Sequence, residues 1–225
     1  MAKNKKKCAG KKKTSAAKKP EFSVKEIEAN NQIYAARQKM YDKYGYNNEK
    51  ERLYIIAKAM PLKGKILEAG TGKGYLALEI AKKGYALTTY DIDRKIQRIA
   101  KMNLAYAGVL GRAKFVIEKK DKLSFKDKSF DVIFCVNTLH HLEKSQTVLD
   151  EFLRVVSDTG KIILSDFTGK TFKIMDRVHK SEGGTHEVIG WSMDEAHDYI
   201  KNKGCKIKDT ADAYQRVFII QREKN

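Results

Sequence analysis

The segment with the clearest chemical signature is a glycine loop, Glu68–Gly74, which reads E-A-G-T-G-K-G. It overlaps the end of a predicted strand, Lys65–Ala69, and precedes a helix-like pattern that begins at Tyr75. Glycines at such a turn let the backbone bend sharply and approach a ligand without interference from Cβ atoms. The loop therefore predicts a nucleotide or nucleoside site, and its spacing has to distinguish between three kinds of ligand.

Two phosphate-containing ligands fit this loop poorly. A triphosphate loop needs G-x-x-x-x-G-K-[ST], but Leu67 stands where the first glycine belongs and Gly74 replaces the hydroxyl residue. The dinucleotide pattern G-x-G-x-x-[GA] is met only from Gly72 onward, two residues after the turn has begun. A carboxylate at Glu68, about 4 Å from a pyrophosphate charge, would also cost roughly 4 kcal/mol. Both ligands are therefore disfavoured.

An acid before the glycines suits a cofactor that carries a positive charge. S-adenosylmethionine has no phosphate, and the ammonium of its methionine end attracts a carboxylate. The E-x-G-x-G-x-G pattern resembles motif I of the class I S-adenosylmethionine-dependent methyltransferases. The resemblance implies S-adenosylmethionine as cofactor, with binding residues Glu68, Gly70, Thr71, Gly72 and Gly74.

A second acid follows the next apolar run. Asp91 comes directly after Leu87–Tyr90, where a strand-end carboxylate can accept hydrogen bonds from both ribose hydroxyls. Such charge-assisted bonds contribute about 1.5–3 kcal/mol each. Because NAD enzymes use the same device, Asp91 supports nucleoside binding without choosing the cofactor. Ile92 is expected to pack on the adenine face, and Asp93 to cap the next helix.

A second block, Ser129–Leu142, reads S-F-D-V-I-F-C-V-N-T-L-H-H-L. It is similar to a block of the small-molecule methyltransferases of the ubiquinone and menaquinone biosynthesis type, and with the glycine loop the resemblance covers residues 64–166. The resemblance implies that Asn137 helps to shape the cofactor pocket and that His140 or His141 faces it. Either histidine is a candidate for proton transfer, the alternative being a hydrogen bond to the backbone.

One position departs from these relatives, which usually place an acid about four residues before an L-P-F triplet, where it binds the adenine amino group. The corresponding triplet here is Leu123-Ser124-Phe125, and Lys119 stands at the position obtained without a gap. Asp121 takes the role only after a small deletion. The alternative is a solvated charge in a lysine-rich turn.

Residues 167–191 are expected to form an irregular flap over the acceptor site. Acids and histidines are frequent in and just before it: Asp166, Asp176, His179, Glu182, His186 and Glu187. No metal site is predicted, because Gly183-Gly184 interrupts any shared helical face. Four tyrosines of the N-terminal region either pack into the core or line the acceptor site: Tyr34, Tyr41, Tyr44 and Tyr46.

The elements that must position these residues alternate between strand-like and helix-like patterns. Helices are predicted at 23–44, 48–60, 75–83, 94–106, 144–156 and about 192–203. Strands are predicted at 65–69, 87–90, 114–117, 130–136, 161–165, 205–208 and 214–221. The alternation predicts an α/β, Rossmann-like fold with helices on both faces of a mostly parallel seven-stranded sheet and a C-terminal antiparallel hairpin. Ligands then bind at the carboxyl ends of the strands.

Charge and composition predict the domain boundaries. The net charge is +18, and residues 1–20 hold nine lysines and no acid. They are predicted to form a disordered tail, either a tether for nucleic acid or another anionic surface or a solubilising extension. Residues 21–61 are predicted to be a helical lid region, and residues 62–225 the cofactor-binding domain.

Two absences bear on the surroundings of the protein. No apolar stretch approaches the roughly 18–20 residues of a membrane span. The three cysteines are scattered and form no CxxC pair, which indicates the reducing cytoplasm. The sequence does not indicate an oligomeric state.

These observations predict an S-adenosylmethionine-dependent methyltransferase with a small-molecule acceptor. A nucleic-acid methyltransferase is the alternative that the charge favours. However, enzymes that act on exocyclic base nitrogens carry N-P-P-Y or D-P-P-Y where this chain has Asn137–His140. Enzymes that methylate C5 of cytosine in RNA need a cysteine nucleophile near the end of this strand, whereas Cys135 lies inside it. A protein methyltransferase is a further alternative.

Overall fold

The computed structural model describes residues 21–118 and 122–223. The predicted lysine-rich tail, residues 1–20, lies outside the described residues, as do Lys119 and Asp121. Within the described ranges the helices are α1 (Val24–Lys43), α2 (Asn48–Ala59), α3 (Tyr75–Lys82), α4 (Arg94–Tyr106), α5 (Ser145–Val155), α6 (Gly169–Ser181) and α7 (Met193–Asn202). Two short 3₁₀ helices are η1 (Leu110–Arg112) and η2 (Leu139–His141).

The described strands form one seven-stranded sheet in the order β3-β2-β1-β4-β5-β7-β6. Their bounds are β1 (Ile66–Ala69), β2 (Leu87–Asp91), β3 (Ala113–Ile117), β4 (Phe130–Val136), β5 (Val156–Phe167), β6 (Cys205–Ala211) and β7 (Gln215–Arg222). The first five strands are parallel, and β7 runs antiparallel to both β5 and β6. The predicted sheet and its C-terminal antiparallel pair are confirmed.

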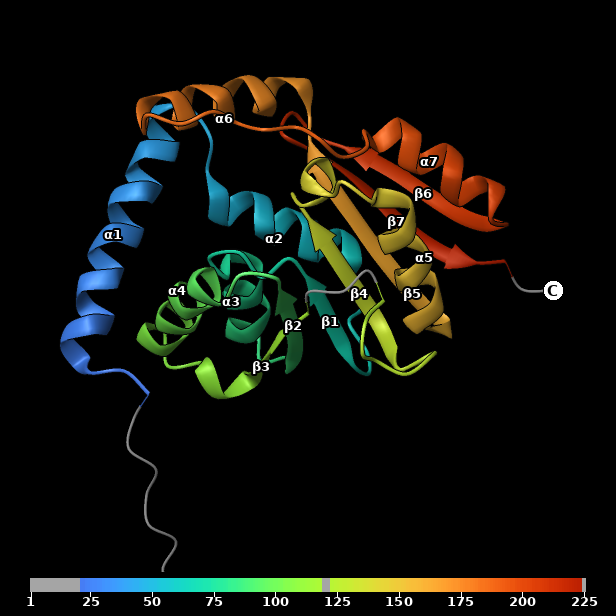
Figure 1. Ribbon diagram of the computed structural model, residues 1–225, viewed down its shortest axis with the longest axis horizontal. Coiled ribbons are helices and arrows are strands. Elements are labelled where there is room, and N and C mark those ends of the chain that lie inside the picture. The colour runs from blue at the N-terminus through green and yellow to red at the C-terminus, as the bar shows by residue number, and fades with distance from the viewer. Residues whose placement is uncertain (1–20, 119–121, 224–225) are drawn as a thin grey trace, which may run out of the picture.

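Helices cover both faces of the sheet, with α2, α3 and α4 on one face and α5 and α7 on the other (Figure 1). Alternate residues of β4 divide between these two layers. Val132 and Phe134 pack in the cluster that contains Ile55 and Leu76, whereas Ile133 and Cys135 pack with α5 and α7. A parallel strand covered on both faces reads as a continuous apolar run for this reason.

The order of the strands reverses between β1 and β4, because the chain proceeds from β1 outward to β3 and then returns to the other side of β1. Open α/β sheets bind ligands at this switch point, outside the carboxyl ends of the strands. The loops after β1, β2, β4 and β5 therefore face this switch point, in line with the expectation that ligands bind at the carboxyl ends of the strands.

The prediction of an irregular stretch over residues 167–191 is wrong for its first half, which forms α6. The helix buries one face at the i, i+3, i+4, i+7 spacing, through Thr171, Ile174, Met175 and Val178. Only the segment between α6 and α7 is irregular. Within the described residues, no helix reaches the length and apolarity that crossing a bilayer requires.

Candidate active site

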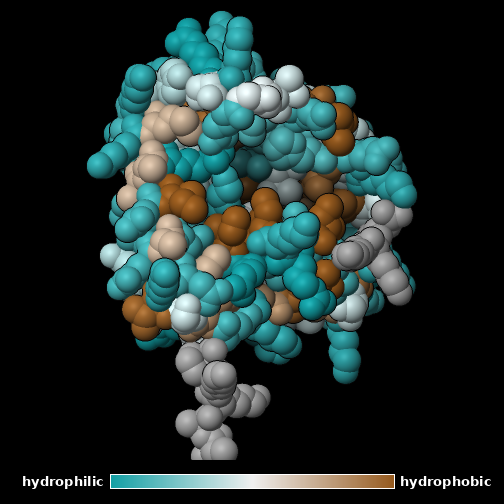
Figure 2. Space-filling view, turned by 60° about the vertical axis from the view of Figure 1, so that its left-hand side comes forward, coloured by the Kyte–Doolittle hydropathy of each residue, from teal (hydrophilic) through white to brown (hydrophobic). Residues whose placement is uncertain are grey.

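A cavity of about 810 Å³ opens at the carboxyl ends of the parallel strands. One side is lined by the glycine loop, Asp91 and Ile92, and the other by His140, His141 and His186. Figure 2 shows hydrophobic side chains gathered around a hollow in the surface. The volume lies within the range of about 300–1,000 Å³ that is typical of small-molecule sites.

The glycine loop turns through three residues with positive φ: Gly70 (79°), Gly72 (50°) and Gly74 (78°). A Cβ at Gly74 would lie 2.7 Å from the Ala100 Cβ, so glycine also lets α3 begin close to α4. The backbone N–H groups of Gly70 and Thr71 both donate to the Tyr90 carbonyl oxygen at 3.0 Å. The loop is thus fixed to β2 while its inner backbone lines the cavity.

Glu68 lies behind the loop and supports it. Its carboxylate accepts hydrogen bonds from the Ala77 N–H, at 3.1 Å, and from the Thr89 hydroxyl. Burial of the side chain raises the pKa of Glu68 to about 8. The carboxyl group borders the cavity from below, and its role in cofactor binding stays a prediction.

The side chain of Thr71 points into the protein and belongs to a network of hydrogen bonds behind the loop. Because Thr89 donates to Glu68, the Thr71 hydroxyl donates to Thr89 at 2.6 Å and accepts from the Gln97 amide at 3.1 Å. Gln97 also donates to the Val116 carbonyl at 2.8 Å. The side chain of Thr71 therefore joins β1, β2 and α4, and only its backbone is available to a ligand.

Asp91 ends β2 at the rim of the cavity. One carboxylate oxygen accepts from the Gly72 N–H at 2.7 Å, and the other accepts from the Asp93 N–H at 3.0 Å. Each oxygen keeps further lone pairs for a ligand hydroxyl. Ile92 is 68% exposed beside it and offers an apolar surface at the cavity wall, while Asp93 caps α4 as predicted.

Asn137 follows β4 with a positive φ of 52°. In the amide orientation that satisfies its neighbours, its oxygen accepts from the Arg52 guanidinium at 2.9 and 3.0 Å, and its nitrogen donates to Gln215 at 3.0 Å. Arg52 is buried at the cavity wall and also donates to the Tyr46 hydroxyl at 3.3 Å. Within the described ranges Arg52 forms no ion pair, so its positive charge borders this side of the cavity without a carboxylate partner.

Glu118, directly after β3, lines the cavity near the predicted adenine-binding position. It is buried, its backbone N–H donates to the Asp91 carbonyl at 3.1 Å, and its carboxylate accepts from the Ser124 hydroxyl. The sequence comparison passes over this acid, because it stands one residue before Lys119. Arg52 is missed for a different reason, since it belongs to α2 and precedes every motif of the site.

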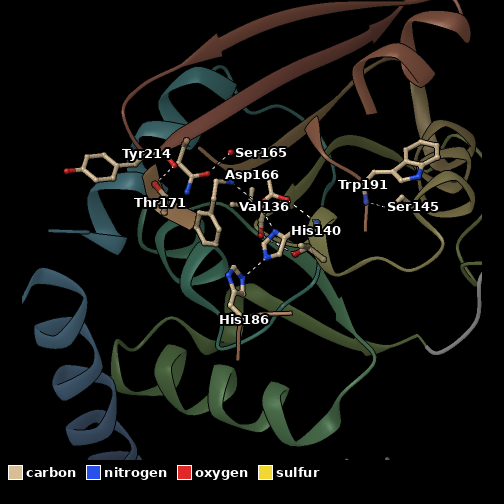
Figure 3. A network of polar contacts seen from close by, with 12 residues as sticks. Val136, His140, Ser145, Ser165, Asp166, Thr171, His186, Trp191 and Tyr214 are labelled. Atoms are coloured by element: carbon tan, nitrogen blue, oxygen red, sulfur yellow. Dashed lines mark hydrogen bonds and ion pairs between the residues drawn. The ribbon is translucent and has the colours of Figure 1, made fainter. Parts of the chain in front are cut away.

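The histidine side of the cavity is built around Asp166 at the end of β5. Asp166 accepts from the His140 backbone N–H at 3.1 Å, and its other oxygen lies 2.7 Å from the His140 Nδ1. The Nε2 atom of His140 lies 3.2 Å from the Nε2 of His186, toward which it points in Figure 3. The more exposed His141 has its pKa lowered to about 4 by partial burial and by the neighbouring imidazoles.

Helices α1 and α6 meet at one edge of the molecule (Figure 1), and residues of both line the cavity. Arg37 of α1 and Glu182, next to α6, form an ion pair at 2.7 Å. Tyr41 packs against Met175 and also lines the cavity, and its contact with an acceptor stays a prediction. Tyr46 is 1% exposed and belongs to the core.

A family model described as "Methyltransferase domain" matches residues 67–164. The ubiquinone/menaquinone biosynthesis C-methyltransferase UbiE of Rickettsia bellii is 27% identical over 164 residues, which are 65% of this chain and 66% of the relative. The sterol 4-C-methyltransferase strm-1 of Caenorhabditis elegans is 32% identical over 100 residues, 44% of this chain and 30% of the relative. The chain thus spans slightly less than two thirds of the first relative and less than a third of the second.

Two solved structures show the same fold at low sequence identity. The PH0226 protein of Pyrococcus horikoshii superposes with a TM-score of 0.64 and 17% identity, covering 87% of this chain and 94% of its own. A SAM-dependent methyltransferase from Aquifex aeolicus gives a TM-score of 0.60 and 17% identity, covering 89% of this chain and 98% of its own. The arrangement of the sheet is therefore shared well beyond the segment that the domain model matches.

Proposed function

We propose that this chain, which belongs to the class I S-adenosylmethionine-dependent methyltransferases, transfers a methyl group to a small-molecule acceptor held beside its histidine cluster. The matched domain and the related methyltransferases support the family and the cofactor, as the sequence resemblance implies. The observation that carries the proposal is one cavity whose two ends differ, with a glycine loop at one end and three imidazoles at the other.

The residues present at the glycine loop fit S-adenosylmethionine. The positive φ of Gly70, Gly72 and Gly74 turns backbone, instead of side chains, toward the ligand. Asp91 is placed to accept from the ribose hydroxyls, and Glu118 is a second acid at the cavity wall for the adenine amino group. Arg52, which forms no ion pair among the described residues, complements the methionine carboxylate. Burial favours the protonated form of Glu68, and a bound ammonium would favour the ionised form that complements it.

The volume of the cavity supports a small acceptor. A site of about 810 Å³ has room for a cofactor and one compact molecule. The relatives named above act on a ubiquinone or menaquinone precursor and on a sterol by their printed names. Nucleic acid remains the alternative acceptor, and its support is the lysine-rich segment 1–20, which lies outside the described residues.

The residues around the acceptor orient it and handle its proton. Bound S-adenosylmethionine supplies a methyl group that its sulfonium already activates, so alignment for in-line attack is the main task of the protein. Asp166 holds the His140 ring at 2.7 Å, which fixes the Nδ1 as donor and leaves the Nε2 free to accept. His140 or His141 then takes the proton that a hydroxyl or ammonium acceptor loses.

Transfer of a radioactive methyl group tests the proposal. The full chain is incubated with methyl-tritiated S-adenosylmethionine and with separate small-molecule, RNA and protein fractions of a cell extract. We expect label in the small-molecule fraction, and less of it with the Asp91→Ala variant because that variant binds the cofactor weakly. Label confined to RNA or protein would contradict the small-molecule assignment while leaving the family intact.

A further inference from the structure

Three imidazoles from two distant segments meet at the acceptor end of the cavity. His140 and His141 belong to η2, and His186 belongs to the segment that follows α6. One nitrogen of each ring lies within 4.8 Å of the corresponding nitrogens of the other two. Figure 3 shows the His186 ring directed at His140 from the opposite side of the site.

Each ring is anchored through one nitrogen to an oxygen or to the backbone. The His140 Nδ1 lies 2.7 Å from Asp166 and the His186 Nδ1 lies 3.2 Å from Asp176, and carboxylates only accept hydrogen bonds. His141 forms a hydrogen bond with the backbone of Glu187. In the neutral rings this leaves the Nε2 atoms of His140 and His186 as lone pairs that face each other at 3.2 Å.

Two facing lone pairs need a positive species between them. A shared proton would place a charged imidazole in a partly buried pocket beside other imidazoles. This arrangement disfavours a bridging proton and favours a cation that both nitrogens can coordinate.

The segment that carries His186 is held in place on both sides. The backbone N–H groups of Ile189 and Gly190 donate to the His140 carbonyl oxygen at 3.0 and 2.9 Å. The His179 ring of α6 stacks on His186 with centroids 5.0 Å apart and planes inclined by 7°. These contacts fix the ring before any ligand binds, as a preorganised ligand set requires.

We propose that His140, His141 and His186 bind one divalent transition-metal ion of the zinc type at the acceptor end of the cavity. Two nitrogens on a tetrahedral zinc ion, each at about 2.0–2.1 Å, are about 3.3 Å apart, close to the 3.2 Å between His140 and His186. Asp166 and Asp176 orient the ligands from behind, as carboxylates do in histidine metal sites. Their two negative charges also balance the ion.

Three protein ligands leave the fourth tetrahedral position for water or a ligand atom in the cavity. The sequence predicts no metal site because it places the ligands on one helical face, and the Gly183-Gly184 pair interrupts such a face. The structure instead combines η2 with the loop after that pair. The site is defined by the imidazoles alone. With the ion bound, the nitrogens of His140 and His141 that coordinate it cannot also take the proton of the acceptor, so metal binding and the proposed proton transfer are alternative uses of these rings.

Titration of Zn²⁺ into the metal-free full chain, with a competing chelator and calorimetric detection, tests the proposal. We expect one tightly bound Zn²⁺ per chain, and at least a 100-fold loss of affinity in His186→Ala. The Asp166→Asn variant should lose about 10–100-fold, because it removes only the orienting carboxylate. The matched control is His197→Ala, whose imidazole belongs to α7 and lies outside the cluster; its affinity should stay within twofold.

Substitution with Co²⁺ gives a readout that a merely structural role would not affect. The wild-type protein should show visible absorption typical of tetrahedral coordination, and His186→Ala should lose it while still binding S-adenosylhomocysteine. Absence of stoichiometric Zn²⁺ in the wild-type protein would overturn the proposal, as would equal affinity in the wild-type and His186→Ala proteins.

Discussion

The two ends of the cavity are built in opposite ways. The centre of the proposed cofactor end uses backbone and a carboxylate from one βαβ unit, in which Gly72 and Asp91 are 19 residues apart. The histidine end joins His140 to His186 across 46 residues. Contacts that come from one βαβ unit are visible in the sequence as a short motif. A site made by bringing distant segments together leaves no local pattern in the sequence.

The largest expected effect separates turnover from cofactor affinity. The His140→Gln substitution should lower kcat by about 10²–10⁴-fold if His140, of the two candidate imidazoles, is the one that takes the proton of the acceptor. Affinity for S-adenosylhomocysteine should stay within about threefold, since the glycine loop is untouched. Steady-state kinetics and calorimetry measure the two quantities, with His197→Gln, which lies outside the cavity, as control. Equal losses in both would show that the two ends do not act separately.

A glycine pair tests how tightly the cofactor end is packed. Gly74→Ala should lower the free energy of unfolding by about 3 kcal/mol, because a Cβ at φ 78° would meet Ala100. Gly72→Ala should cost only about 1 kcal/mol, because its Cβ would enter open space. Urea denaturation of both variants gives the comparison, and equal losses would contradict the packing argument.

An acid pair tests which carboxylate reaches the cofactor. Asp91→Ala should weaken binding of S-adenosylhomocysteine at least about tenfold, through loss of a charge-assisted hydrogen bond and of the Gly72 contact. Asp93→Ala removes the cap of α4 and should cost about 1 kcal/mol of stability with unchanged affinity. Calorimetric titration and denaturation of both variants check this. Unchanged affinity in Asp91→Ala together with lost affinity in Asp93→Ala would exclude Asp91 as the binding carboxylate.

A further expected effect concerns pH. The pKa of Glu68 is about 8 in the folded chain against 4.5 for the free group, so between these values the folded state holds a proton that the unfolded state has released. The free energy of unfolding should therefore fall as pH rises through this window, by about 1 kcal/mol per unit for this group. Glu68→Gln should lack that slope. Denaturation at pH 5, 6, 7 and 8 measures it, and parallel curves for the two proteins would contradict the burial of Glu68.

The sequence predicts the sheet, the glycine loop and Asp91, because strand ends and loop spacing are local properties. It misjudges α6, whose apolar spacing is obscured by the histidines and acids around it. Arg52 and the pairing of His140 with His186 are beyond local patterns, since each depends on how α2, η2 and the segment after α6 pack together. The elements that carry the glycine loop and Asp91 are accordingly more predictable than those that carry the histidines.

Calorimetric titration with S-adenosylhomocysteine, with NAD as the comparison, tests the central claim most directly. If the glycine loop, Glu68 and Arg52 form a site for a cofactor with an amino-acid end, the full chain should bind one S-adenosylhomocysteine, and an excess of NAD should not displace it. Absence of binding heat at several temperatures, or displacement by NAD, would contradict the account.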